Sequence, residues 1–382
     1  MDPSADPLPE GRWLVNGLAF FSSLEPALAA ARTSIRLEAY IVGDDSVGRR
    51  IREALTAASR RGVRVTVLVD GLGSAELPSG WWSPLTQAGG VVHVFNPPAS
   101  RRIGIRDHRK LVVIDERAAW VGGINFAQEY DGDGFEKGWA DCGFQVGGGA
   151  AEQLATEFDL MVAECAARQP KVVLGRMRRG TRPPSRVIGR GLELMVSGPG
   201  RLANAFQKSL REDVAASREV QFAVAYFLPG YRMRQLLRSV AARGTRVQIL
   251  VPGRSDVAVA LRAARHLYGS LMRAGVEIWE YQPQVLHVKL FLANRAAYVG
   301  SSNLDTRSLH INYELMLRLT DPDLVAQGQS MFTELRARAV RIDPQAWAAS
   351  RSWLERWRDQ WAFWILSRAD PYVTRWLAMG PR

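Results

Sequence analysis

Two stretches of the chain repeat each other: HRKLVVIDERAAWVGGIN at residues 108–125 and HVKLFLANRAAYVGSSN at residues 287–303. Each contains two short apolar runs and ends in a glycine turn, which is typical of a pair of adjacent strands. A second repeated unit precedes each of these stretches, at residues 35–70 and 220–251. In both copies the pattern predicts a strand, a loop, a helix and a second strand. Apolar strands separated by helical stretches indicate βαβ units with a buried, largely parallel sheet. The sequence therefore predicts a duplicated α/β protein.

The chain of 382 residues is long enough for two such halves. We predict an N-terminal half at residues 1–167, a linker at residues 168–191, a C-terminal half at residues 192–335 and a helical tail at residues 336–382. The linker range is rich in Arg, Gly and Pro and has no acidic residue, which is typical of an exposed connection. Binding of a polyanion is the alternative interpretation of that basic segment.

The composition excludes several classes of protein. Apolar and charged fractions of 47% and 23% are those of a globular chain, not of a disordered or collagen-like one. Only Cys142 and Cys165 are present, without a CxxC pair, which excludes a disulfide scaffold and a zinc ribbon. Neither a secretory signal nor a long apolar span is visible, so we expect a cytosolic chain. The net charge of +12 favours nucleic acid, an anionic membrane or phosphate-bearing substrates as partners.

Two of the five histidines occupy matching places in the repeats, and each has a lysine two positions later. They are His108 with Lys110 and His287 with Lys289. Residues i and i+2 of a strand share a face, so each pair places an imidazole beside an ammonium group. The glycine turn that follows carries an amide or hydroxyl in each half, at Asn125, Ser301 and Asn303. Doubled by the repeat, these groups predict a pocket of phosphate ligands.

The same residues resemble the paired HxKxxxxD motifs of the phospholipase D superfamily. HRKLVVID at 108–115 matches in full and includes Asp115, whereas HVKLFLAN at 287–294 departs at its last position, Asn294. The stretches EAYIVGDD at 38–45 and GSSNLDTRSLHINYE at 300–314 are most similar to the bacterial cardiolipin synthase branch. The resemblance implies two pseudo-symmetric α/β/α halves with mixed sheets, packed so that both HxK pairs meet at one phosphodiester.

The resemblance also implies a mechanism without a metal or other cofactor. One histidine attacks phosphorus to give a phosphohistidine, and the other protonates the leaving alcohol and then deprotonates the incoming alcohol or water. Lysines and asparagines bind the non-bridging oxygens. Each imidazole also needs a carboxylate at its other ring nitrogen. By position in the family pattern, Glu314 is expected to serve His287, and Asp141 is expected to serve His108.

The motif aspartate has a different expected role. Residue 115 lies seven positions after His108 and therefore has the opposite strand parity, so we predict that Asp115 faces away from the phosphate and serves the turn. The second repeat is one residue shorter at this turn. Asn294 is itself a good turn former, so we expect its departure from the pattern to leave catalysis intact.

The tail is dense in tryptophan. Trp353, Trp357, Trp361 and Trp364 fall at helical spacing and form one aromatic stripe, with arginines around it. One interpretation is that the helix packs on the catalytic body. The other is that it lies at a membrane interface, with Trp at headgroup depth and Arg on anionic phosphate. Both interpretations hold if one face of the helix packs on the body and another face contacts the membrane.

Taken together, these features predict a peripheral enzyme on the cytoplasmic side of the cell membrane. We expect a cardiolipin synthase-like phosphatidyltransferase whose partners are a phospholipid substrate and an anionic membrane surface rather than nucleic acid. The alternatives are a phospholipase D hydrolase, a phosphatidylserine synthase-like transferase, a nuclease of the same superfamily, or an inactive binding module, the last suggested by Asn294. The acceptor alcohol, the identity of the attacking histidine and the oligomeric state stay open at this point.

Overall fold

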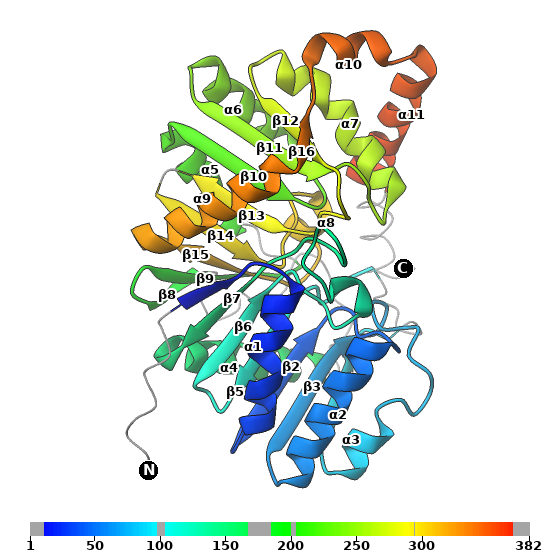
Figure 1. Ribbon diagram of the computed structural model, residues 1–382, viewed down its shortest axis with the longest axis vertical. Coiled ribbons are helices and arrows are strands. Elements are labelled where there is room, and N and C mark those ends of the chain that lie inside the picture. The colour runs from blue at the N-terminus through cyan, green and yellow to red at the C-terminus, as the bar shows by residue number, and fades with distance from the viewer. Residues whose placement is uncertain (1–10, 98–103, 167–184, 200–203, 294, 370–382) are drawn as a thin grey trace, which may run out of the picture.

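The computed structural model describes residues 11–97, 104–166, 185–199, 204–293 and 295–369. Over these residues the chain forms two α/β halves, each built on one sheet (Figure 1). Residues 167–184, most of the predicted linker, lie outside the described part of the chain. Residues 185–189 belong to a strand of the second sheet, so that sheet begins earlier in the chain than the predicted boundary at residue 192.

The first sheet has seven strands in the order β1-β7-β6-β5-β2-β3-β4. Strands β2, β3 and β4 pair in parallel, and the other neighbours pair antiparallel. The bounds in sheet order are β1 Gly11–Leu14, β7 Gly143–Gly147, β6 Ala118–Gly122, β5 Leu111–Ile114, β2 Ser34–Ala39, β3 Arg64–Asp70 and β4 Val91–Phe95.

The second sheet has nine strands in the order β16-β12-β11-β10-β13-β14-β15-β9-β8. Its segment β15-β14-β13-β10-β11-β12 reproduces β7-β6-β5-β2-β3-β4 of the first sheet, which confirms the duplication and the mixed sheets. The bounds in sheet order are β16 Ala339–Arg341, β12 Glu277–Tyr281, β11 Arg246–Pro252, β10 Glu219–Val224, β13 Lys289–Ala293, β14 Ala296–Gly300, β15 Glu314–Leu319, β9 Leu192–Ser197 and β8 Ser185–Gly189.

Helices cover both faces of each sheet. In the first half α1 and α2 share a core with one face of the sheet, whereas α4 lies on the other face. Helix α2 shows why the sequence folds in this way, since the Asp45 carboxylate caps its first turn and Ile51, Leu55 and Ala58 form its buried stripe. The bounds are α1 Gly17–Ala30, α2 Ser46–Arg60, α3 Ser83–Gln87 and α4 Gly148–Ala166, with a short 3-10 turn at Gln128–Tyr130.

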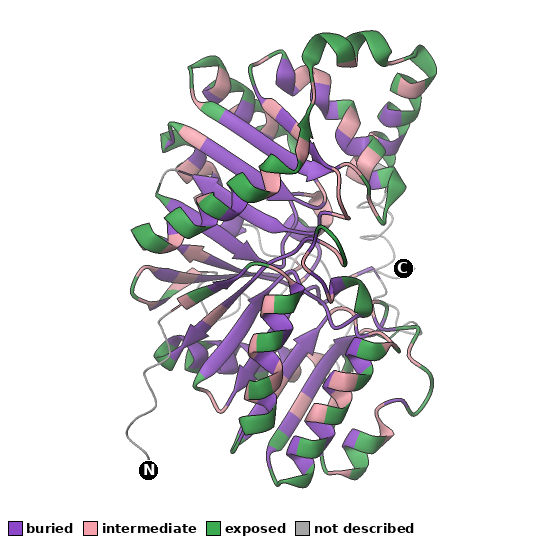
Figure 2. Cartoon of the chain, in the orientation of Figure 1, coloured by how far each residue is buried: buried purple, intermediate pink, exposed green. Residues whose placement is uncertain are grey.

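The second half repeats this arrangement, with α5, α6 and α7 on its outer core and α9 on its inner one. Residues of α4 and α9 and of the facing strands of both sheets form a single hydrophobic core that joins the halves. Figure 2 shows this as buried strands at the centre and half-exposed helices around them. The bounds are α5 Ala205–Ala216, α6 Tyr231–Ala242, α7 Ala258–Met272, α8 Thr306–His310 and α9 Pro322–Ala337.

The tail forms helices α10, Pro344–Ser350, and α11, Trp353–Trp364, and ends in a π-helical turn at Ile365–Ala369. Figure 1 shows α11 lying along α7 at the edge of the second half, and the two helices are in contact. Ala362 of α11 is buried on this face, and Phe363 stacks on His266 of α7 with ring centroids 5.0 Å apart. The four stripe tryptophans lie on the solvent side of α11, where Trp353 is 78% exposed and the other three are about half exposed. No helix in the described ranges is long and apolar enough to cross a membrane.

Candidate active site

Two short backbone pairings join the halves and determine the geometry of the site. In the first, Asp107 bridges in parallel to Tyr313, and the His108 amide donates a hydrogen bond to the Tyr313 carbonyl at 3.0 Å. His108 and Glu314 each follow one member of this bridge, so the pairing brings them side by side.

The second pairing repeats the first with the halves exchanged. Ala140 bridges in parallel to Leu286, and the His287 amide donates to the Ala140 carbonyl at 2.7 Å. Here His287 and Asp141 are the residues that follow the bridge. The two connections together place both HxK pairs at the junction between the halves, as the sequence predicts.

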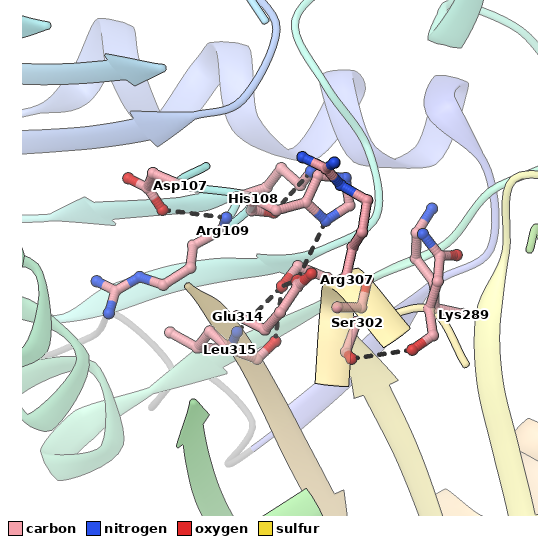
Figure 3. Close-up of polar contacts among 12 residues, drawn as sticks. Asp107, His108, Arg109, Lys289, Ser302, Arg307, Glu314 and Leu315 are labelled. Carbon is pink, nitrogen blue, oxygen red and sulfur yellow. Dashed lines mark hydrogen bonds and ion pairs between the residues drawn. The ribbon is translucent and has the colours of Figure 1, made fainter. Parts of the chain in front are cut away.

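The carboxylate of Glu314 lies at the imidazole of His108. Nδ1 of His108 is 3.1 Å from Oε2 of Glu314 (Figure 3). The Ser301 hydroxyl donates to the same oxygen at 2.5 Å. Burial raises the pKa of Glu314, but His108, Lys110 and the bond from Ser301 outweigh it, so its pKa lies below the ordinary value. Glu314 is therefore an anion that accepts the Nδ1 proton of His108 and leaves Nε2 for chemistry.

The Asp141 carboxylate makes the equivalent contact with His287, where Nδ1 and Oδ2 are 2.7 Å apart. Gly123 occupies the place that Ser301 has in the other half, and a Cβ atom at Gly123 would lie 2.4 Å from an Asp141 oxygen. The glycine thus makes room for this carboxylate, while the longer Glu314 is matched with a serine.

The sequence pattern predicted the wrong carboxylate partner for each of the two histidines. The sequence pattern assigned Glu314 to His287 and Asp141 to His108, each within its own half. The structure shows the reverse, with His108 bound to Glu314 and His287 bound to Asp141. The physical reason is the pair of bridges between the halves, which aligns each histidine with the carboxylate of the opposite half.

Both lysines are buried, and each bonds the backbone carbonyl of the histidine two positions before it. Burial and the neighbouring Lys289 lower the pKa of Lys110 to about 7, and burial also lowers the pKa of Lys289. Two ammonium groups in one buried site repel each other, and an anion between them relieves that repulsion. The lysine pair therefore favours an anion at this place in the site.

The histidines are shifted toward their neutral forms. Burial lowers the pKa of His108, and burial together with Lys289 lowers the pKa of His287 to about 4. A neutral imidazole with Nδ1–H held by a carboxylate carries its lone pair on Nε2, which is the form required of a nucleophile or a general base.

The two asparagines differ from each other. Asn125 donates one hydrogen bond to the Tyr130 hydroxyl at 2.7 Å and accepts one from the Ile41 amide at 3.1 Å, so part of its amide is engaged within the protein and its role as a phosphate ligand stays a prediction. The side-chain oxygen of Asn303 is buried and has no hydrogen-bond partner among the described residues. Ser301, expected beside Asn303 as a phosphate ligand, is bonded to Glu314.

Asp115 faces away from the site, in agreement with its strand parity. It follows β5 in a tight turn with φ of +53°, and its carboxylate accepts hydrogen bonds from the backbone amides of Arg32, Thr33 and Ser34. It therefore fixes the start of β2. Asn294, at the matching turn of the second half, lies outside the described residues.

Sequence reasoning missed the groups that surround the histidines. Tyr40 packs on His108 with ring centroids 4.9 Å apart, and Tyr130 and Trp139 pack on His287 at 5.2 and 5.6 Å. Tyr40 has a sequence signal, because EAYIVG is echoed by AYFLPG in the second half. Tyr130 and Trp139 have no such counterpart.

Arg109, between the first histidine and lysine, was also missed. Its guanidinium points away from His108 (Figure 3) and bonds both carboxylate oxygens of Glu38 at 2.7 and 2.8 Å and Glu157 at 3.2 Å. The matching position in the second half is the buried Val288. Buried ion pairs thus anchor the first HxK motif, while apolar packing anchors the second.

The chain is similar to known phospholipase D-like proteins over most of its length. The family described as "Cardiolipin synthase, PLD-like domain" matches residues 24–140 and 214–336. Cardiolipin synthase B of Salmonella typhi is 33% identical over 378 residues, covering 95% of this chain and 89% of that relative. The cardiolipin synthase of Halalkalibacterium halodurans is 32% identical over 309 residues, which are 79% of this chain and 61% of that relative.

Among solved structures, phosphatidylserine synthase of Haemophilus influenzae superposes with a TM-score of 0.71 at 15% identity, covering 96% of this chain and 95% of that one. The polyphosphate kinase of Porphyromonas gingivalis gives a TM-score of 0.60 at 16% identity, covering 88% of this chain and 49% of that one. At these identities the likeness shows the fold alone. The family match and the sequence relatives show that the chain belongs to the cardiolipin synthase-like family of the phospholipase D superfamily.

Proposed function

We propose that the protein moves a phosphatidyl group from one phosphatidylglycerol molecule to a hydroxyl of a second one and so forms cardiolipin and glycerol. The observation that carries the proposal is the crossed site, in which two neutral histidines, each bonded to a carboxylate of the opposite half, share one buried junction with two lysines. The curated relatives described above, which carry the name cardiolipin synthase, support the choice of substrate.

The reaction uses the two histidines in turn. Nε2 of one histidine attacks phosphorus and forms a P–N bond while the bond from phosphorus to the glycerol oxygen breaks, and the other histidine gives its proton to that oxygen. The negative charge of the bound phosphodiester raises the pKa of the proton-donating histidine. In the second step the hydroxyl of the acceptor lipid loses its proton to the same histidine and displaces the first one from phosphorus.

Helix α11 supports a location at the membrane surface. Its buried face packs on α7, while Trp353, Trp357, Trp361 and Trp364 are exposed on the opposite side. Exposed tryptophans with nearby arginines suit the headgroup region of an anionic bilayer. We place this face on the cytoplasmic leaflet, with the substrate drawn from the same membrane.

The test incubates the purified protein with phosphatidylglycerol vesicles and separates the products. Formation of cardiolipin together with an equal amount of glycerol is the expected result. Phosphatidic acid as the main product would instead indicate a hydrolase, and cleavage of added DNA without any change in the lipid would indicate a nuclease. A His108→Ala sample treated in parallel shows that the product comes from this site.

A further inference from the structure

A tyrosine and an exposed carboxylate form a pair in the second half. The partly buried Tyr226 donates a hydrogen bond from its hydroxyl to Oδ2 of Asp256 at 2.6 Å, and the Ser255 hydroxyl donates to Oδ1 at 3.2 Å. Both donors are neutral, so neither bond cancels the negative charge of Asp256. The other carboxylate near Tyr226 is that of Asp305, which caps the first turn of α8. Asp256 is therefore the anion that this side of the molecule presents to solvent.

The backbone places Tyr226 beside the candidate site. The Ala225 amide donates to the carbonyl of Val288 at 3.0 Å, and Val288 is the residue between the histidine and the lysine of the second HxK motif. Phe227 bridges in parallel to Leu304, the residue directly after the GSSN turn. Tyr226 lies between these two attachments and is thus held next to both conserved-looking features of the second repeat, the HxK strand and the turn.

Electrostatic effects among neighbouring side chains agree with this placement. Burial raises the pKa of Tyr226 most, and Asp256 and Tyr40, which packs on the first histidine, add to the shift. Burial also raises the pKa of Tyr130, which packs on the second histidine, and Tyr226 and Asp256 contribute to it. Burial lowers the pKa of Lys289, and Asp256 is among the anions that oppose this change. The charge of Asp256 therefore acts on the lysine pair and on the aromatic rings beside both histidines.

The duplication does not repeat this pair. Val42 bridges to Phe126 in the first half as Phe227 bridges to Leu304 in the second, so the position that matches Tyr226 is Ile41. An isoleucine side chain cannot hold a carboxylate by a hydrogen bond. The tyrosine–carboxylate pair is thus a specific feature of the second half.

The chemistry of phosphatidylglycerol indicates which part of the lipid suits a carboxylate at this place. The phosphate is an anion, which Asp256 repels and the lysines attract. The diacylglycerol part offers ester oxygens, which accept hydrogen bonds and do not donate them. The glycerol head group has free hydroxyls, and these donate strong hydrogen bonds to a carboxylate. Of the three parts, only the head group gains from contact with Asp256.

We propose that Asp256, held by Tyr226, is a specificity-determining residue that binds the hydroxyls of the glycerol head group exchanged at phosphorus. This inference rests on the proposed function. The carboxylate forms and breaks no covalent bond. It favours an alcohol that has a second hydroxyl besides the one that reacts, because an alcohol with a single hydroxyl has no donor left for Asp256.

The test measures exchange of the head group of phosphatidylglycerol vesicles in equal concentrations of radiolabelled glycerol and radiolabelled propan-1-ol. In the exchange the alcohol oxygen bonds to phosphorus as the bond from phosphorus to the histidine nitrogen breaks, and the hydroxyl proton goes to the other histidine. The products are labelled phosphatidylglycerol and labelled phosphatidylpropanol. Their ratio reports the preference for the alcohol and is independent of the amount of active enzyme.

The variants are Asp256→Asn and Tyr226→Phe, and the matched control is Asp213→Asn. Asp213 on α5 also accepts a hydrogen bond from a tyrosine hydroxyl, that of Tyr298, but this pair belongs to the outer face of the second sheet. We expect Asp256→Asn to lower the ratio of glycerol to propanol product about fivefold, because a hydrogen bond to a charged acceptor is stronger than one to an amide. Tyr226→Phe should lower the ratio about threefold, because the carboxylate is then no longer held in place. Asp213→Asn should leave the ratio within about twofold of the wild type.

An unchanged ratio in Asp256→Asn, or an equal loss of both products, would overturn the inference. The exchange needs no second lipid as acceptor, so it separates this inference from the proposed function. Exchange with the expected change of ratio but without cardiolipin would contradict the proposed acceptor and leave the role of Asp256 standing. Cardiolipin formation with the same ratio in the wild type and in Asp256→Asn would do the reverse.

Discussion

The imidazole of His287 and the carboxylate of Asp141 belong to opposite halves of the chain, yet Nδ1 and Oδ2 are 2.7 Å apart. The His108–Glu314 contact crosses in the other direction. Each half therefore contains the histidine and lysine of one HxK motif but not the carboxylate that contacts that histidine. The halves are joined at the candidate site as well as in the core that they share.

Replacing either carboxylate by its amide should greatly reduce activity without unfolding the protein. In Asp141→Asn and Glu314→Gln the shape is retained, but the acceptor for the Nδ1 proton is weakened, so the imidazole is no longer held in one tautomer. We expect turnover of phosphatidylglycerol to fall by about 10²-fold or more in each variant.

The control for these amides is Glu193→Gln on β9, a carboxylate that pairs with Arg318 away from the histidines. It should keep turnover within about twofold, since exposed or half-exposed ion pairs contribute little. Near wild-type turnover in Asp141→Asn or Glu314→Gln would contradict the role assigned to the crossed pairs.

His108→Ala and His287→Ala should each abolish turnover while the circular dichroism spectrum stays that of the wild type. The reason is that one histidine cannot attack phosphorus and protonate the leaving oxygen on the opposite side in the same step.

Turnover should also persist in EDTA, because an imidazole is the nucleophile in this mechanism. Loss of turnover in EDTA that one divalent ion restores would contradict it.

The buried His287 should make stability depend on pH. Its pKa is lowered by burial and by Lys289 to about 4, whereas the unfolded chain has the ordinary value near 6.5. Between these two values the unfolded chain binds more protons, so the free energy of unfolding rises as the pH rises from about 4 to 6.5. In His287→Ala this part of the slope is lost.

Urea denaturation at several pH values measures this slope. Other titrating groups contribute to the total, so the comparison is between the slopes of the wild type and of the variant rather than between their absolute stabilities. His93→Ala, a change on strand β4 outside the site, is the matched control. Equal slopes for the wild type and His287→Ala would show that the His287 pKa is not lowered.

The sequence predicts the features that are local and repeated. The strand pair at each HxK motif, the parity of Asp115 and the duplication all follow from short-range patterns. The crossed carboxylates could not be predicted, because they depend on the bridges of Asp107 to Tyr313 and of Ala140 to Leu286, which join residues far apart in the chain.

Two further features, the Tyr130–His287 contact and the exposed side of α11, could not be predicted from the sequence. The contact of Tyr130 with His287 has no echo in the second repeat, so the duplication gave no signal for it. The tryptophan spacing of α11 indicated one stripe but not which side of the helix packs on α7, and only the packing of Ala362 and Phe363 shows that the stripe is exposed.

Asp115→Ala should lower stability and leave catalysis nearly unchanged. The carboxylate accepts hydrogen bonds from three consecutive backbone amides, which lower its pKa although burial opposes them. Loss of these bonds should cost about 1–3 kcal/mol in the free energy of unfolding.

The corresponding Asn294→Asp change should alter turnover by less than about threefold. A large loss of turnover in folded Asp115→Ala, or a large gain in Asn294→Asp, would show that these turn positions act in catalysis.

The exposed face of α11 should bind anionic membranes. Removing residues 344–382 does not test the exposed face alone, because the truncation also uncovers the surface of α7 on which Ala362 and Phe363 pack. The double change Trp357→Ser with Trp361→Ser alters side chains that are 52% and 46% exposed and leaves the packed face intact. Sedimentation with phosphatidylglycerol vesicles should show binding weakened by about tenfold or more, since both tryptophans would bury apolar surface at headgroup depth. Val187→Ser, at a 78% exposed position on β8, is the control and should bind as the wild type does.

Hydrolysis of a small soluble phosphodiester should stay unchanged in the double variant, because α11 does not contribute to the site. Wild-type binding should also fall with added salt, because attraction between arginine and the headgroups is screened over about 8–10 Å at physiological ionic strength. Unchanged vesicle binding by the double variant would place the membrane contact elsewhere on the molecule.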